Sequence, residues 1–252
     1  MVGKLPSLAG LEETFSFENL NVERGLLWNQ TNSVNRGVQV NHSAGPISLA
    51  LSWNDGFYSG RFSWLSGSVT WNVNSTDTLA FIGAANAGTT IISHTATPVL
   101  QNNSQMYNLI YTHTSGPWIV TPYLQFTYVP RTPSIDVLHY GATYGAALLG
   151  SYAFDSASKV GGLSLHGFSL PLRMEYIAST GSVADGAPNL LYGPGSAAWS
   201  VTVTPTYQYE RFFTRAEFSY VGAYDTTNGS AFGPHGSATT QTRLLLEWGV
   251  LF

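Results

Sequence analysis

Arginine and glutamate recur at short, even spacings in segments that otherwise alternate apolar and polar residues. The charges are Arg173 and Glu175, Arg215 and Glu217, and Arg243 and Glu247. An even spacing in a β-strand places both side chains of a pair on one face. If the apolar faces of these strands meet lipid, the charges must point inward, because an Arg at the bilayer midplane would cost about 2–4 kcal/mol.

Two interpretations of these inward charges stay open on the sequence alone. They form either a charged ladder that narrows a pore and orients ions or polar solutes, or a self-neutralising network of ion pairs that fills a small lumen. Both interpretations place the charges on a lumen wall, together with neutral polar neighbours. The predicted pore-lining residues are Arg173, Glu175, Arg215, Glu217, Arg243, Glu247, Thr202, Thr204 and Gln208.

Other reactive residue types do not form a recognisable catalytic or metal-binding pattern. The six His residues are scattered, without the His-Glu-x-x-His spacing of a zinc site, and Cys is absent. Hydrolysis is the main enzymatic alternative, yet no Ser stands in Gly-x-Ser-x-Gly. We therefore expect no enzyme activity, no metal and no cofactor.

The composition restricts the class of protein. Charged residues make up 10% of the 252 residues, against about 25% in an ordinary soluble domain. Hydrophobic residues nevertheless reach only 44%, with a mean hydropathy of +0.02. The sequence contains no apolar run of about 18 residues, so a helical membrane protein is disfavoured. A net charge of −4 without a basic stripe disfavours nucleic acid as a partner.

Strict alternation is the main structural signal. About twelve segments show it, and their lengths suit the roughly 9–11 residues that cross a bilayer at a tilt. The predicted strands lie near 13–28, 34–43, 46–55, 63–74, 77–86, 103–114, 117–130, 142–155, 163–179, 197–210, 212–225 and 240–252.

Tight and longer connections alternate between these predicted strands, as expected for a meander. We predict an all-β, transmembrane, antiparallel up-and-down barrel of about 12 strands, with tight periplasmic turns and longer extracellular loops. It forms a single domain over residues 1–252. The longer loops at 87–102 and 180–196 are candidates for an inward-folded constriction, which the sequence leaves undecided.

The last predicted strand has one wholly apolar face. Its residues Leu244, Leu246, Trp248, Val250 and Phe252 are predicted to face lipid and to carry the signal read by the barrel-assembly machinery. The other interpretation is an ordinary amphipathic strand that happens to end in Phe. Aromatic residues near strand ends, among them Trp28, Trp53, Trp71 and Trp118, predict two interfacial girdles.

Both ends of the chain resemble the OmpL-like family of outer-membrane β-barrel porins. The motifs are VGKLPSLAGLE with FENLNVERGLLW, then NRGVQVNHSAGPISLALSWNDGFYSG, and near the end FFTRAEFSYVGAYDTTNGSAFG followed by a strand that ends in Phe. In that family further strands precede the VGK-like segment. The chain is thus either a shorter closed barrel or a form without those N-terminal strands.

The resemblance implies a porin of a bacterial outer membrane, which lets small polar solutes or ions diffuse passively. A non-conducting structural or partner-binding barrel is the alternative. Residues 1–10 have no apolar signal-peptide core, so we expect no signal peptide in this sequence. The expected partners are outer-membrane lipid, the barrel-assembly machinery, small solutes and, as an open possibility, further copies of the chain. Solute identity, ion selectivity and oligomeric state are not encoded in any motif.

Overall fold

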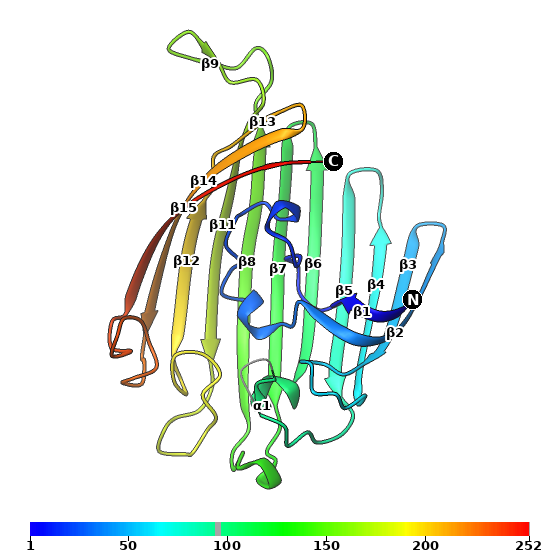
Figure 1. Cartoon of the computed structure of the whole chain (residues 1–252), viewed down its shortest axis with the longest axis vertical. Helices are drawn as coiled ribbons and strands as arrows, with labels where there is room; N and C mark the ends of the chain where they lie inside the picture. Colours follow the sequence, from blue (N-terminus) through cyan, green and yellow to red (C-terminus); the bar gives the residue numbers. More distant parts are fainter. Residues whose placement is uncertain (94–96, 252) are drawn as a thin grey trace.

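Long antiparallel strands dominate the computed structural model, which describes residues 1–93 and 97–251 (Figure 1). Thirteen strands of the described residues form one curved sheet. They are β1 (Val2–Pro6), β2 (Val34–Ala44), β3 (Ile47–Asn54), β4 (Trp64–Asn72), β5 (Asp77–Asn86), β6 (Gln105–Ser115), β7 (Trp118–Val129), β8 (Gly141–Ala153), β11 (Phe168–Ser179), β12 (Ala197–Val203), β13 (Thr206–Tyr209), β14 (Phe212–Tyr224) and β15 (Thr240–Val250).

Each strand pairs with its neighbour in the sequence, which gives the predicted meander. Among the described residues, this order is interrupted where β8 pairs with β11, and again at β12 and β13, which both lie between β11 and β14 and keep one register with both. They form one interrupted strand, because Pro205 between them has no N–H to donate to the ladder. At the two edges, β1 pairs with β2 and β15 with β14, and the described residues contain no ladder between β1 and β15.

The connections alternate in length along most of the sheet. Two-residue turns at 45–46 and 116–117 contrast with the long loops at 87–104, 180–196 and 225–239. One predicted connection is wrong. The link expected at 156–162 runs from 154 to 167, projects beyond the sheet on the tight-turn side, and contains a small hairpin of β9 (Lys159–Val160) and β10 (Leu163–Ser164) (Figure 1).

The short helical elements all lie outside the sheet. They are η1 (Ser16–Glu18), η2 (Trp28–Gln30), α1 (Val99–Asn102) and η3 (Pro133–Ile135). None of the helices in the described residues is long and apolar enough to cross a membrane.

The convex face of the sheet is apolar and bordered by aromatic residues. Leu244, Leu246 and Trp248 on β15 are 74%, 78% and 79% exposed, as expected of side chains that would face lipid rather than water. On the neighbouring strands, aromatic residues gather near both strand ends and aliphatic residues lie between them. Near the long loops these are Trp53, Tyr107, Tyr144, Tyr176 and Trp199, and near the tight turns Trp71, Tyr111, Trp118, Phe168 and Phe212.

The concave face is polar and is crossed by residues 7–33, which we call the inner segment (Figure 1). The predicted strand at 13–28 is therefore wrong. Its stretch contains η1, and its end leads into η2, with no ladder to any neighbour. Trp28 belongs to η2 and stacks under Arg24, with the guanidinium carbon 5.1 Å from the ring centre, so it is not part of a lipid-facing girdle.

Candidate functional site: the inner segment and its anchoring wall

Glu217 on β14 binds the backbone of the inner segment. Its carboxylate accepts N–H bonds from Val22 at 2.6 Å and Glu23 at 2.9 Å, and a hydroxyl bond from Thr204 at 2.8 Å. Thr204 in turn accepts a bond from the Asn21 amide at 2.7 Å. The Glu217 side chain is almost wholly buried. A buried carboxylate must be compensated by donors, and here backbone N–H groups supply most of them.

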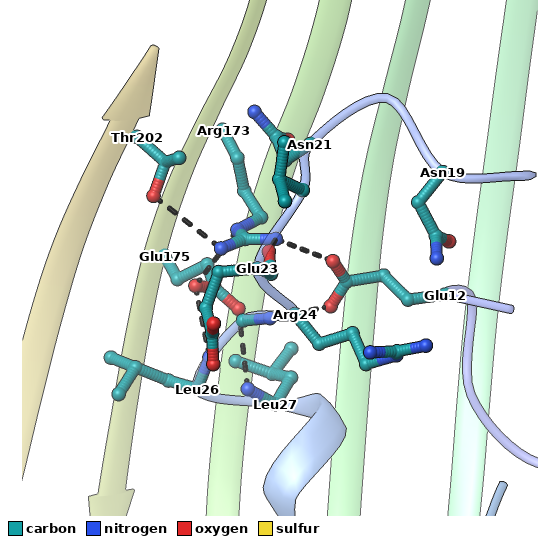
Figure 2. A network of polar contacts seen from close by, with 12 residues as sticks. Glu12, Asn19, Asn21, Glu23, Arg24, Leu26, Leu27, Arg173, Glu175 and Thr202 are labelled. Carbon is teal, nitrogen blue, oxygen red and sulfur yellow. Dashed lines mark hydrogen bonds and ion pairs between the residues drawn. The ribbon is translucent and has the colours of Figure 1, made fainter. Parts of the chain in front are cut away.

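Glu175 on β11 binds the following residues of the inner segment in the same way. It accepts N–H bonds from Leu26 at 3.0 Å and Leu27 at 3.2 Å (Figure 2). It also accepts a hydroxyl bond from Ser200 at 2.7 Å. Because Gly25 has no side chain, its backbone can lie against this carboxylate. A Cβ atom at Gly25 would overlap the Glu175 oxygens.

Two arginines of the wall bind the carbonyl groups of the same segment. Arg173 donates to the Glu23 carbonyl at 2.7 Å and forms ion pairs with Glu12 and, at 3.2 Å, with Glu175 (Figure 2). Arg215 donates to the carbonyls of Asn19 at 2.8 Å and Ser16 at 2.9 Å.

Arg215 also pairs with Glu247 on β15, and Ser16 donates its hydroxyl to that same carboxylate. Both arginine side chains are about 95% buried. Burial raises the pKa of Glu12 in the inner segment, and the Arg173 charge opposes that rise.

The inner segment also packs through apolar and amide contacts. Leu26 and Leu27 join the largest buried apolar cluster, with Ile177 and Ala147 among the wall residues. Gly145 on β8 leaves room for Leu27, since a Cβ atom there would lie 2.8 Å from Leu27 Cγ. The Gln125 amide donates to the Leu27 carbonyl at 2.9 Å. The segment is thus held by hydrophobic burial as well as by charge.

The predicted wall residues lie on the concave face, and most of them contact the inner segment. Arg173 and Glu175, Arg215 and Glu247, and Thr204 and Glu217 also contact each other. Thr202 is buried beside Arg173 at 3.4 Å, and Arg243 pairs with Glu23 at 2.8 Å. Gln208 is exposed near the tight-turn end and borders a recess with Arg215. From the sequence, both a charged ladder and a self-neutralising network of ion pairs were possible. In the structure the wall charges form some ion pairs with one another, and most of them also bind the inner segment.

The remaining predicted residues belong to the last strand. Leu244, Leu246, Trp248 and Val250 lie on the convex face, opposite Arg243 and Glu247. Phe252 lies outside the described residues, and so does His94. The described residues contain no group of three or more His, Cys, Asp or Glu that could hold a metal ion.

Sequence reasoning missed the contribution of the inner segment. Glu12 and Glu23 pair with wall arginines, and Asn21 binds Thr204, yet each of the three precedes its partner by at least 150 residues. A signal was present in the composition of residues 7–33, which carry four Glu and one Arg in an otherwise weakly charged chain. The connection that crosses the concave face is the one between β1 and β2, which the sequence did not suggest as an inward-folded loop.

Open space remains on both sides of the inner segment. A recess of about 90 Å³ lies among Glu23, Arg24, Tyr192 and Arg243, toward the long loops. A second recess of about 260 Å³ lies between Glu13 and Glu18 on the segment and Thr121 and Leu149 on the wall. A polar concave face, narrowed by a segment that leaves space beside it, is the arrangement found in a channel interior.

A family model described as "Putative beta-barrel porin-2, OmpL-like" matches residues 1–252. The chain belongs to this family of β-barrel porins. The resemblance drawn from the sequence motifs is thereby confirmed, and so is the antiparallel β-barrel class of fold. Comparison with curated protein sequences gave no match.

Solved structures of a porin and of an outer-membrane protein share the fold of this family member at low sequence identity. An anion-selective porin from Comamonas acidovorans superimposes with a TM-score of 0.55 at 13% identity, over 86% of this chain and 59% of its own. OmpT of Vibrio cholerae, with its loop L8 deleted, gives 0.59 at 11% identity, over 98% and 73%. The in-vitro folded trimer form of OmpT gives 0.58 at 9% identity, also over 98% and 73%.

These similarities show the fold alone. This chain spans 59% of the length of the Comamonas porin and 73% of that of OmpT.

Proposed function

We propose that this chain forms a passive outer-membrane channel for small polar solutes or ions, and that the inner segment sets its width. The observation that carries the proposal is the anchoring of residues 7–33 across the polar face by Glu175, Glu217, Arg173 and Arg215. A segment that only filled the interior of the barrel could be held there by apolar side chains alone. Here a defined backbone path is fixed by charged groups, with recesses left beside it.

The proposal includes the setting in which such a channel works. The apolar convex face contacts outer-membrane lipid, and the last strand is read by the barrel-assembly machinery. The pore-lining role of the polar wall belongs to the same proposal, as do the absence of enzyme activity and the treatment of residues 1–252 as one domain. OmpT has a trimer form, and we extend homo-oligomer formation to this chain as part of the proposal.

A non-conducting barrel is the second candidate. It is favoured by one observation, the buried apolar cluster that Leu26 and Leu27 form with the wall, which could close the interior to water.

Single-channel recording of the purified protein in a planar bilayer separates the two candidates. A passive channel gives stable current steps that are proportional to voltage, and heat-denatured protein provides the control. A correctly folded barrel, shown by its heat-modifiable mobility on gels, that gives no steps would refute the channel and favour the non-conducting barrel.

A further inference from the structure

The charges on the concave face and inner segment are unequal in number. Carboxylates outnumber guanidinium groups by seven to four among the described residues. The acidic residues are Glu12, Glu13, Glu18, Glu23, Glu175, Glu217 and Glu247, and the basic residues are Arg24, Arg173, Arg215 and Arg243. The excess of three negative charges comes from the inner segment, because the six charged wall residues balance.

The arginines are largely occupied by other groups. Arg173 and Arg215 are buried in ion pairs and in bonds to backbone carbonyls. Arg243 is half-exposed and pairs with Glu23 at 2.8 Å. Arg24 stacks on Trp28 and donates to the Glu13 carbonyl at 3.2 Å. A passing anion would therefore meet few free positive charges.

Two carboxylates are exposed and have no cationic partner. Glu13 and Glu18 lie on the surface of the inner segment, and within the described residues neither is within 4.0 Å of a Lys, Arg or His nitrogen. Both border the larger recess beside β7 and β8.

The loop that carries these two carboxylates is fixed in place. Asn19 accepts the Glu13 N–H at 2.7 Å and donates to the carbonyls of Glu13 and Phe15. The Glu18 carboxylate accepts the Phe15 N–H at 3.3 Å. Glu13 and Glu18 are therefore held beside the recess.

We propose that the channel prefers cations and that Glu13 and Glu18 determine this preference. The inference rests on the proposed channel function and adds its selectivity. Fixed charges that line a pore concentrate counter-ions and exclude ions of their own sign. The effect is strongest at low salt, because the Debye length is about 10 Å at about 0.1 M and about 3 Å at about 1 M.

The reversal potential under a salt gradient tests the proposal. We expect the wild-type protein to give the sign for cation preference. In the Glu13→Gln/Glu18→Gln variant, the cation-to-anion permeability ratio should fall about twofold or more near 0.1 M salt, where the two charges are poorly screened. Conductance near 1 M salt should change little, since Gln keeps the shape and can still accept the Phe15 N–H.

A matched control removes the same number of charges elsewhere. Asp136→Asn/Asp185→Asn neutralises two exposed carboxylates in the long loops, and its permeability ratio should match the wild type. Anion preference in the wild type, or an unchanged ratio in the Glu13/Glu18 variant, would overturn the inference. The absence of any current would instead refute the channel itself, and the inference with it.

Discussion

At the scale of single residues, buried carboxylates in this protein bind backbone N–H groups as much as they bind arginines. Glu217 has three donors, two of them from the inner segment, and Arg215 two positions earlier binds two carbonyls of that segment. The Arg-x-Glu spacing therefore provides both a donor and an acceptor for one strip of backbone. The Arg-x-Glu spacing suggests an ion pair within the strand, but here both side chains bind main-chain groups of the inner segment, an arrangement we call the clamp.

Glu217→Gln tests this clamp. The substitution keeps the side-chain shape but turns one oxygen into an NH₂ group that faces other donors. Hydrogen bonds to a charged group contribute about 1.5–3 kcal/mol each, so we expect the undocked fraction of the inner segment to rise about tenfold or more. Single-channel current should become larger and noisier, and trypsin should cleave after Arg24 faster.

Glu210→Gln provides the control for that variant, since Glu210 is exposed in the turn between β13 and β14. It should behave like the wild type in both assays. If Glu217→Gln left the current and the trypsin cleavage unchanged, the carboxylate would not be what holds the segment.

At the scale of elements, eleven of the twelve predicted strands correspond to strands of the sheet. Their alternation is a local signal, because each strand separates an apolar face from a polar one. The segment at 13–28 is not a strand, although Phe15 and Phe17 have the spacing of two that is typical of one. In the structure their rings stack on each other, with ring centres 5.7 Å apart. The true partners of the segment are side chains far along the chain, so no local pattern marks them.

The candidate site was predictable to a similar extent. Alternation alone placed Arg173, Glu175, Arg215 and Glu217 on the polar face, because it fixes the face of every residue in a strand. It could not reveal that these side chains are occupied by residues 12–27, since hydrogen bonds to backbone groups leave no trace in residue types. The five residues of β1 were also missed, because a strand that short gives too few alternations to recognise.

The interruption between β12 and β13 leads to a prediction about stability. Ala216 donates its N–H to the Pro205 carbonyl at 3.1 Å, but proline cannot return the bond. Pro205 is exposed on the convex face, so Pro205→Val keeps an apolar residue there and adds an N–H opposite Ala216. We expect a gain of about 0.5–1.5 kcal/mol.

The temperature of the heat-modified gel shift should rise for this variant. Pro171→Val on β11 is an informative comparison, because the carbonyl of Thr204 opposite it already accepts the Thr206 hydroxyl at 3.0 Å. The gain there should be smaller. A lower transition temperature for Pro205→Val would show that the break is needed for the curvature of the sheet.

At the scale of the whole molecule, the concave side combines a wall whose charges balance with an acidic inner segment. This separation has a consequence for pH. Partial desolvation of the Glu13 carboxylate beside the wall and the neighbouring Glu18 charge raise the pKa of Glu13, so it takes up a proton at a higher pH than an ordinary Glu. Loss of that charge weakens any preference for cations.

We therefore expect the cation-to-anion permeability ratio to fall on acidification, beginning above the usual pKa of glutamate. Reversal potentials recorded over a range of pH measure this change. In Glu13→Gln the early part of the fall should disappear. A ratio that stays constant until ordinary carboxylates titrate would contradict the prediction.

The anchoring of the inner segment also bears on the order in which the molecule is built. The bonds from Val22 to Glu217, from Leu26 to Glu175 and from Ser16 to Glu247 join residues 195, 149 and 231 positions apart. Contacts of such separation form late, because the intervening chain must first be ordered. We therefore expect the inner segment to reach its final place only after the last hairpin has formed, which would make its docking the completing step of assembly.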